Sequence, residues 1–380
     1  MIHPAFLVNS LLRYNIDFYA GVPDSLLKDL CAYLTDHSEK KNSVIAANEG
    51  AAMGLAAGHY LASGEIPVVY MQNSGLGNTV NPLLSLTDEE VYNIPTLLFV
   101  GWRGEPGKKD EPQHVKQGKV TLPLLEAMGL RYMIMADEES VLSQQLEEAV
   151  AYMNETKRAF AFVVRKGTFE SYKLQKNEDN GCELKREEAI GLVANALPDE
   201  AVVISTTGMI SRELFEYRAQ NGEGHNRDFL TVGSMGHASQ IALGIALHQP
   251  NRPVYCFDGD GAVLMHMGSL AIVGRMAGNR YVHVVFNNGA HDSVGGQPTV
   301  GLQICLPEIA KACGYQSVYT ISTKDELQDV LAQLQEVKGP VLLEIKVCKG
   351  ARKNLGRPTT TPIQNKNNFM NYLKKEINDN

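Results

Sequence analysis

The chain has 380 residues, of which 44% are hydrophobic and 21% charged, as expected of a folded, soluble protein with room for two domains. Its formal net charge of −8 argues against nucleic acid or an anionic membrane as a main partner. An anionic ligand would therefore need local cations, a helix N-terminus or a metal ion. Six cysteines without a C-x-x-C pair argue against a disulfide framework or a cysteine zinc site, and predict a cytoplasmic protein.

The first half alternates short β-rich runs with segments of helical spacing, which predicts a parallel α/β sheet. Residues 1–15 predict an amphipathic helix without an export signal, and no apolar run reaches the roughly 20 residues of a membrane span. Strands are predicted within SVIAA, PVVYMQ, TLLFVG and FAFVVRK, with the helical segment EGAAMGLAAGHYLASG after the first of them.

A polar stretch without periodicity, residues 175–187, is predicted to link a domain of residues 1–174 to a second domain of residues 188–380. Alternation resumes after it in AVVIST, FLTVG, VYCFDGD, YVHVVFNN and PVLLEIKV, enough strands for a second sheet. We therefore predict an α/β protein with two doubly wound, mostly parallel-sheet domains. Two helices rich in small residues, NEGAAMGLAAG and GSMGHASQIALGIA, form either a faint repeat between the halves or two unrelated, tightly packed helices.

Polar residues stand at the ends of two predicted strands in the second half. The run VYCFDGDG ends in Asp258 and Asp260 between glycines, the helical AVLMHMGSLAIVGRMA follows, and the next strand ends in Asn287 and Asn288. Ligands bind at the carboxyl ends of parallel strands, and carboxylate and amide oxygens suit Mg²⁺. An EF-hand would need further acids where residues 264–267 stand, and a dinucleotide site would need G-x-G-x-x-G. The pattern therefore predicts a cation site that holds a diphosphate.

This GDG motif followed by NN resembles the signature of thiamine-diphosphate-dependent 2-oxo acid decarboxylases. The resemblance implies thiamine diphosphate and Mg²⁺ as cofactors, with the metal on Asp260, Asn288 and the carbonyl of Ala290; Asn287 is the less favoured amide. It also implies a pyrimidine-binding domain followed by a diphosphate-binding domain, with no middle domain. The expected assembly is a homo-oligomer, at least a dimer, with active sites between subunits.

Two further features match the family pattern. Glu49 begins a small-residue helix where the family places the glutamate that contacts the aminopyrimidine ring, although a glutamate at a helix start is ordinary by itself. By resemblance, the Gly233 carbonyl would accept the aminopyrimidine amino group, and Met235 would hold the cofactor bent, unless it is simply a core methionine. The cofactor-binding residues implied are Glu49, Gly233, Ser234, Met235, Gly259, Asp260, Gly261, Ala262 and Asn288.

The compact two-domain form resembles the branch of the family that acts on phosphonopyruvate or sulfopyruvate. The stretches AGVPDSLL, GWRGEPGKKDEPQH, NNGAHDSVGGQPT and LGRPTTTP favour the phosphonate. The resemblance implies conversion of 3-phosphonopyruvate to phosphonoacetaldehyde and CO2, through a thiamine ylide and an enamine, in phosphonate biosynthesis. The alternatives are a sulfopyruvate substrate, a carboligating enzyme, or a non-catalytic cofactor-binding scaffold. The joint presence of Glu49, Asp260 and Asn288 weighs against the scaffold.

A small anionic 2-oxo acid would need local cations in this acidic chain. Residues 101–119 and 348–358 are basic, and their glycines and prolines favour shaped binding loops over the solvated loops that charge runs usually form. The predicted catalytic residues are Glu49, Asp24 and His114, although Asp24 also suits a helix cap. The predicted substrate-binding residues are Asp24, Ser25, Arg103, Lys108, Gln113, His114, His291 and Arg357, and Asp292 is expected to face the substrate beside His291.

Overall fold

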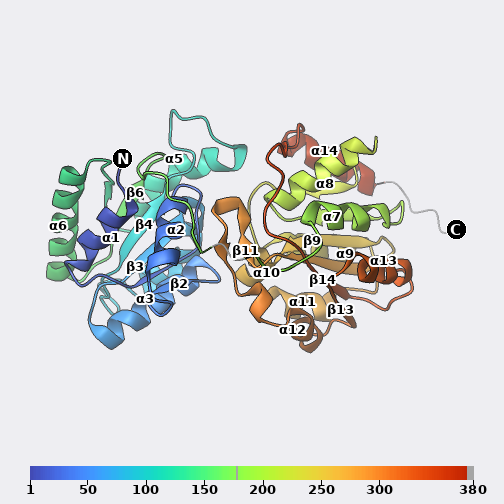
Figure 1. Cartoon of the computed structure of the whole chain (residues 1–380), viewed down its shortest axis with the longest axis horizontal. Helices are drawn as coiled ribbons and strands as arrows, with labels where there is room; N and C mark the ends of the chain where they lie inside the picture. The colour runs from blue at the N-terminus through green and yellow to red at the C-terminus, as the bar shows by residue number, and fades with distance from the viewer. Residues whose placement is uncertain (177–178, 375–380) are drawn as a thin grey trace. The chain divides into compact units, whose positions relative to one another are not determined.

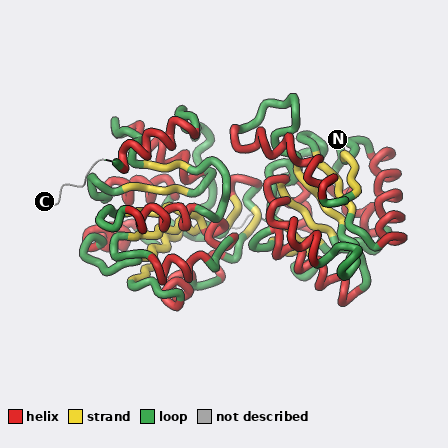
Figure 2. The backbone as a smooth tube through the Cα atoms, turned by 180° about the vertical axis from the view of Figure 1, so that it is seen from behind, coloured by secondary structure: helices red, strands yellow, loops and turns green. Residues whose placement is uncertain are grey.

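The computed structural model of the chain (Figure 1) describes residues 1–176 and 179–374. It divides into two compact units, Met1–Asn177 with Val294–Gln297, and Glu178–Ser293 with Pro298–Asn380. Each unit is built around a six-stranded parallel sheet with helices packed against it (Figure 2). The predicted fold class, two doubly wound parallel-sheet domains without a middle domain, is confirmed. Residues 177–178 of the predicted linker, and residues 375–380 at the end of the predicted second domain, lie outside the described residues.

The first sheet has the strand order β2-β1-β3-β4-β6-β5. Side chains of β3 alternate between two buried clusters, because successive residues of a strand point to opposite faces. Val68 and Tyr70 join α1, α2 and α6, whereas Val69 and Met71 join α3, α4 and α5. The elements are α1 Pro4–Leu12, β1 Tyr19–Gly21, α2 Lys28–His37, β2 Ser43–Ile45, α3 Glu49–Ser63, β3 Val68–Gln72, η1 Asn73–Gly75, α4 Leu76–Ser85, β4 Leu97–Gly101, α5 Pro112–Ala127, β5 Arg131–Ile134, α6 Glu139–Thr156 and β6 Phe160–Val164.

The second sheet has the strand order β13-β14-β10-β9-β7-β8. Tyr255 and Phe257 of β9 pack with α7, α8 and α13, and Val254 and Cys256 pack on the opposite face with α9, α11, α12 and α14. The elements are α7 Arg186–Asn195, β7 Val202–Ser205, α8 Met209–Gln220, β8 Asp228–Leu230, α9 Ala238–His248, β9 Val254–Gly259, α10 Asp260–Met265, α11 Ser269–Met276, β10 Tyr281–Asn287, β11 Ala290–His291, η2 Asp292–Val294, β12 Gln297–Pro298, η3 Gly301–Gln303, α12 Leu306–Ala312, β13 Ser317–Ile321, α13 Lys324–Gln333, β14 Val341–Lys346 and α14 Pro362–Leu373.

The sequence pattern missed some elements and merged others. It did not predict β1, which has three residues, or β5 and β13, which are edge strands and only partly buried. The single helix expected after the DGDG run is wrong, because the chain leaves the helical conformation at His266 (φ −135°, ψ 48°) and resumes it at Ser269. The loop before α9 approaches this break, since a Cβ on Gly236 would lie 2.7 Å from the His266 ring.

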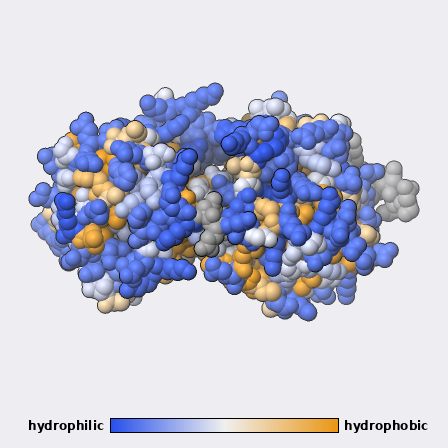
Figure 3. Space-filling model, in the orientation of Figure 1, coloured by the Kyte–Doolittle hydropathy of each residue, from blue (hydrophilic) through white to orange (hydrophobic). Residues whose placement is uncertain are grey.

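The hydrophilic surface and the unpaired cysteines are those expected from the amino-acid composition. Hydrophilic residues dominate the face of the molecule seen in Figure 3, with hydrophobic residues scattered among them. Within residues 1–176 and 179–374, no helix combines the length and the apolar character needed to cross a membrane. All six cysteines are free thiols.

A fully buried ion pair joins α8 to β8. Both side chains of Arg218 and Asp228 have 0% exposure, and Arg218 Nε lies 3.1 Å from Asp228 Oδ2. Burial raises the pKa of Asp228, although the Arg218 charge opposes that shift. Arg218 Nη1 also lies 2.6 Å from Glu223 Oε2, and the Glu223 side chain is partly exposed.

We predict that Asp228→Asn lowers the free energy of unfolding by about 3 kcal/mol, because it leaves the buried Arg218 charge undercompensated. Urea unfolding followed by circular dichroism measures this change. As a control, Glu188→Gln breaks an exposed pair with Lys324 (2.9 Å) and should cost about 1 kcal/mol or less. Equal losses in the two variants would contradict the prediction.

Candidate active site

Asp260 lies at the carboxyl end of β9, beside the end of β10. The two strands pair in parallel with Phe286 opposite Gly259, so the residues that follow them are neighbours. Asp260 is buried, and burial raises its pKa to about 6 against hydrogen bonds from Thr299 and from the backbone of Asn288. A cation would compensate this desolvated carboxylate, and oxygen donors on two adjacent strand ends fit Mg²⁺.

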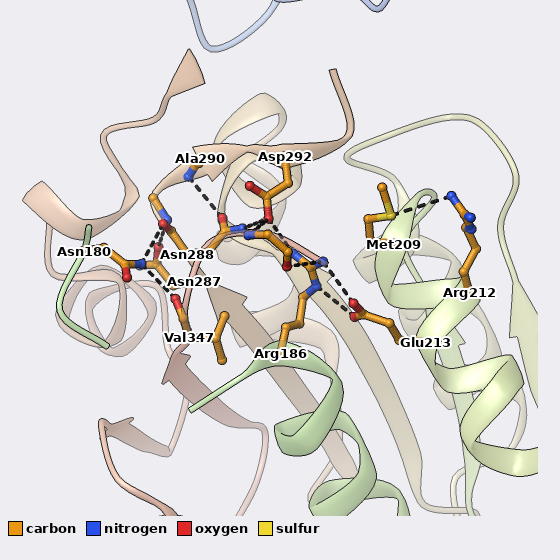
Figure 4. A network of polar contacts seen from close by, with 12 residues as sticks. Asn180, Arg186, Met209, Arg212, Glu213, Asn287, Asn288, Ala290, Asp292 and Val347 are labelled. Carbon is orange, nitrogen blue, oxygen red and sulfur yellow. Dashed lines mark hydrogen bonds and ion pairs between the residues drawn. The ribbon is translucent and has the colours of Figure 1, made fainter. Parts of the chain in front are cut away.

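The two asparagines after β10 have different surroundings. Asn287 Nδ2 donates to Gly301 O at 2.9 Å and to Glu344 Oε1 at 2.7 Å, so both amide hydrogens brace neighbouring segments. Asn288 donates instead to Asp292 Oδ2 at 2.6 Å, and its Oδ1 accepts from the Ala290 N–H at 3.0 Å (Figure 4). The structure thus brings Asn288 and Ala290 together beside Asp260, whereas the amide group of Asn287 donates to Gly301 and Glu344.

Glycines bring backbone and side chains close around Asp260. A Cβ on Gly301 would lie 2.6 Å from Asp260 Oδ2, and one on Gly261 would lie 3.0 Å from the His291 ring and 3.4 Å from Met235. Burial lowers the pKa of His291 to about 4, so its imidazole is neutral at pH 7. The structure therefore brings Met235 and His291 to the start of α10.

The loop before α9 has an unusual backbone. Ser234 is exposed and has φ 53°, a left-handed conformation that non-glycine residues rarely adopt and that clusters at functional sites. Gly233 and Met235 are half-buried on either side of it, and Gly236 also has a positive φ, 86°. Of the other predicted cofactor residues, Gly259 is half-buried at the end of β9, and Ala262 is buried in α10.

Glu49 is the first residue of α3 in the first unit and is 5% exposed. Its Oε2 accepts from Asn78 Nδ2 at 2.6 Å, while Oε1 lies against Gly75, where any Cβ would overlap the carboxylate. Asn48 caps the helix by accepting from the Ala51 N–H at 2.9 Å. Asn78 and Gly75 belong to the run NSGLGN. No local sequence pattern indicated that this run would contact Glu49.

A second cluster in the first unit joins Asp24, Ser25 and Arg103. Asp24 is 1% exposed, and burial raises its pKa to about 6, opposed by the Leu26 backbone N–H (3.0 Å to Oδ2) and by the charge of Arg103. Arg103 Nη1 donates to Ser25 Oγ at 2.7 Å. Gly101 lies so close to Asp24 that any Cβ there would overlap Oδ2 of the carboxylate.

Asp110, a residue not predicted from the sequence, fixes the guanidinium of Arg103. Arg103 Nε donates to Asp110 Oδ2 at 2.8 Å, and Nη2 donates to Oδ1 of the same carboxylate. The hydrogen bond from Arg103 lowers the pKa of Asp110 to about 2, and the same bond raises the pKa of Arg103. Asp110 follows two lysines. In the sequence this stretch stands out only through its basic residues, so the role of Asp110 was not predicted.

His114 and Gln113 lie at the start of α5, and His114 is close enough to Arg103 and Asp110 for their charges to act on it. His114 is 8% exposed, and burial together with the Arg103 charge lowers its pKa to about 4. His114 Nδ1 and Gln113 Oε1 are buried atoms without a hydrogen-bond partner among the described residues. Such orphaned polar atoms call for a ligand or water. Lys108, by contrast, is exposed on the loop before α5.

The basic segment at residues 348–358 forms a strap on the second unit, in which Arg352 is ion-paired. Arg352 pairs with Glu187 at 2.8 Å and also with Glu216. These two carboxylates attach the strap to the unit and compensate the charge of Arg352. Arg212 Nε donates to the Gly356 carbonyl at 2.6 Å. Arg357 follows on this strap and is exposed.

Comparison with known proteins finds a matching family model for each half of the chain. The N-terminal TPP binding domain of thiamine pyrophosphate enzymes matches residues 4–140, and the C-terminal TPP binding domain of the same enzymes matches residues 206–345. The chain belongs to the thiamine-pyrophosphate-dependent decarboxylases. Family membership and thiamine diphosphate as the family's cofactor are confirmed, whereas the metal ion and the roles of single residues stay predictions.

Two relatives in this family match almost end to end. Phosphonopyruvate decarboxylase of Streptomyces viridochromogenes is 35% identical over 98% of this chain and 95% of its own length. Phosphonopyruvate decarboxylase of Streptomyces hygroscopicus is 34% identical over 98% and 94%. Sulfopyruvate decarboxylase of Methanosarcina acetivorans is more distant, at 28% identity over 87% of this chain and 88% of its own.

The raised pKa of Asp24 predicts a pH-dependent stability. The fold favours the protonated acid, so the contribution of Asp24 to stability is fully present below pH 3.8, its ordinary pKa, and is lost as pH rises through about 6. Asp24→Asn keeps an acceptor for the Leu26 N–H and cannot ionise. It should be more stable than wild type at pH 8 by about 3 kcal/mol, with no difference at pH 3.5. Urea unfolding at both pH values measures this, and equal stability at pH 8 would contradict it.

Proposed function

We propose that this decarboxylase converts 3-phosphonopyruvate to phosphonoacetaldehyde and CO2, with thiamine diphosphate and Mg²⁺. The observation that carries the proposal is near-full-length similarity to two phosphonopyruvate decarboxylases, at 34–35% identity, against 28% for a sulfopyruvate decarboxylase. Six free thiols accord with a place in the cytoplasm.

Residues at the carboxyl end of the second sheet would hold the cofactor's charged end. Asp260, the Asn288 amide oxygen and the Ala290 carbonyl would bind Mg²⁺, and the metal would bridge to the diphosphate. Gly233 and Met235, on the loop with left-handed backbone, would contact the aminopyrimidine. When bound, the cofactor supplies an electron sink that lets the carboxylate leave as CO2.

Glu49 would exchange a proton with the aminopyrimidine ring. The contact with Asn78 occupies Oε2, and Gly75 leaves room for Oε1 only because it has no side chain. This places one carboxylate oxygen in a fixed direction, which proton transfer requires. A glutamine at position 49 would keep the shape and lose the proton.

Asp24 and His114 are our candidates for handling protons at the substrate. Loss of CO2 leaves a carbon that must take up one proton before the aldehyde can form. A carboxyl group with a pKa of about 6 exchanges protons readily near neutral pH, and the neutral imidazole of His114 can donate or accept a hydrogen bond. Asp24 is the stronger candidate for the acid because its pKa is nearer to neutral.

Arg103 would read the phosphonate. Among the described residues, its hydrogen bonds to Asp110 and Ser25 use three of the five N–H donors of a guanidinium, so donors remain for an anion. Asp110 orients the fork, and planar donors suit a phosphonate. Lys108 and Arg357 lie on exposed loops and would add positive charge.

We also propose a homo-oligomer of at least two copies, with each active site formed from two chains. Two observations support it: Glu49 belongs to the first unit and Asp260 to the second, and each half matches a separate TPP binding domain. In such a dimer one copy would supply Glu49 and the other would supply Asp260.

Mixed dimers test the cofactor residues and the assembly together. Glu49→Gln should lose at least about 100-fold in kcat, because the amide cannot transfer the proton. Asp260→Ala should bind thiamine diphosphate poorly even with excess Mg²⁺, as calorimetry would show. A hybrid with one copy of each variant, isolated through two different tags, should recover about half of wild-type activity, since one of its two shared sites is intact.

Either of two results would contradict these assignments. Near-normal turnover of Glu49→Gln would exclude its catalytic role. A hybrid as inactive as its parents would mean that both residues of a site come from one chain.

Substrate choice is tested with phosphonopyruvate, sulfopyruvate and pyruvate on wild type, Arg103→Ala and Arg357→Ala. A phosphonate is nearly dianionic and gains more from each cation than a sulfonate does, so wild type should prefer phosphonopyruvate by kcat/KM. Each variant should lose about ten- to a hundredfold on phosphonopyruvate and much less on pyruvate, the scale of one charge-assisted hydrogen bond.

The matched control is Arg131→Ala, which breaks a surface pair with Glu148 and should leave all three ratios unchanged. Equal losses on phosphonopyruvate and pyruvate would show that Arg103 and Arg357 do not read the phosphonate. A wild-type preference for sulfopyruvate would overturn the proposed substrate.

A further inference from the structure

One carboxylate oxygen beyond the predicted metal loop collects three hydrogen bonds. Asp292 Oδ2 accepts from Asn288 Nδ2 at 2.6 Å, from the Gly350 backbone N–H at 2.9 Å and from Arg186 Nη1 at 3.0 Å (Figure 4). We expected Asp292 to face the substrate, but this oxygen is directed into the second unit. The Asp292 side chain is only 12% exposed.

Arg186 is itself fixed. Its Nε and Nη2 donate to the two oxygens of Glu213 at 2.8 and 3.0 Å, and the exposed fractions of the two side chains are 5% and 2%. The Glu213 and Asp292 charges outweigh the desolvation and raise the pKa of Arg186. Arg186 begins α7 and Glu213 lies in α8, so two helices anchor the group that holds Asp292.

The position of Asp292 determines how the side-chain amide of Asn288 is oriented. A side-chain amide has a donating end and an accepting end, whereas an ionised carboxylate only accepts. Asp292 therefore selects the rotamer in which Asn288 turns its NH2 group away from the Ala290 N–H. Oδ1 then accepts from the Ala290 N–H, and the backbone of the same Asn288 is hydrogen-bonded to Asp260.

We propose that Asp292, held by Arg186 and Glu213, is a positioning residue that presents the Asn288 oxygen, and not its nitrogen, to the metal ion. The inference rests on the metal site of the proposed function. Metal ions bind the amide oxygen, so an inverted amide would place N–H groups at the metal. The network also holds α7, α8 and the loop at residues 288–292 together, and this structural role differs from the positioning role in what a substitution changes.

The decisive variant is Asp292→Asn. Its amide retains the size of the side chain but can donate as well as accept, so the Asn288 amide is free to invert. We expect the Mg²⁺ concentration for half-maximal binding of thiamine diphosphate to rise by about 10- to 100-fold, the usual effect of losing a group that orients a metal ligand. Calorimetry on the apoprotein at fixed thiamine diphosphate, with Mg²⁺ titrated, measures this without any turnover.

The matched control is Glu223→Gln. Glu223 also accepts from arginines, Arg218 at 2.6 Å and Arg227 at 2.9 Å, and lies in the same unit; within residues 1–176 and 179–374 its hydrogen bonds do not involve the metal loop. It should leave the Mg²⁺ requirement unchanged. A shift in Glu223→Gln equal to that in Asp292→Asn would assign the effect to general loss of stability and overturn the proposal.

The role of Arg186 is tested by combination. Arg186→Lys keeps the charge but cannot bridge Glu213 and Asp292 together, so it should raise the Mg²⁺ requirement by itself. In the Asp292→Asn background it should add less than about twofold, because it acts through Asp292. Fully additive effects would contradict that route.

The failure of this inference is distinguishable from failure of the proposed function. If wild type binds thiamine diphosphate in a Mg²⁺-dependent manner and Asp260→Ala does not, the metal site stands. An unchanged Mg²⁺ requirement in a folded Asp292→Asn then overturns the positioning role alone. If wild type shows no Mg²⁺-dependent binding, the metal site and the inference both fall.

Discussion

The parallel register of β9 against β10 is the constraint on which the candidate active site depends. It sets Gly259 opposite Phe286 and therefore makes neighbours of the two strand ends that carry Asp260 and the asparagines. The same register sorts alternate side chains of β9 into two separate buried clusters. A slip of one residue would exchange the clusters and separate the ligands at once, so packing and chemistry select the same pairing.

The pKa of each carboxylate in the candidate site depends on how deeply the group is buried and on which groups lie next to it. Asp24 and Asp260 both have a pKa raised to about 6 because desolvation exceeds their hydrogen bonds. Asp110 lies next to the same Arg103 as Asp24, yet its pKa is lowered to about 2 because it takes the guanidinium directly and is less buried. Arg103 thus lies beside one acid with a pKa of about 2 and another with a pKa of about 6, and the difference follows from the direct hydrogen bond to Asp110 and from the deeper burial of Asp24.

The sequence was sufficient where chemistry and local pattern coincide. Alternation of strands and helices predicted both sheets, and the polar residues after two strands predicted that their side chains meet at one sheet edge, as the register of β9 and β10 shows; the cation itself stays a prediction. It was insufficient where partners lie far apart along the chain. Arg186 and Asp292 are separated by 106 residues, and Asn78 and Glu49 by 29, so no periodicity relates them. Edge strands such as β5 were missed because a half-buried strand lacks a clear apolar face.

Gly101 and Asp24 show how a backbone position and a side chain become one unit. Any Cβ at position 101 would overlap the Asp24 carboxylate, so the carboxylate can occupy its position only because residue 101 has no side chain. For anyone who builds mutant libraries on this scaffold, the two positions cannot be varied independently. A library that randomises position 101 alone samples mostly clashes, whereas one that also shortens residue 24 opens a new volume beside Arg103.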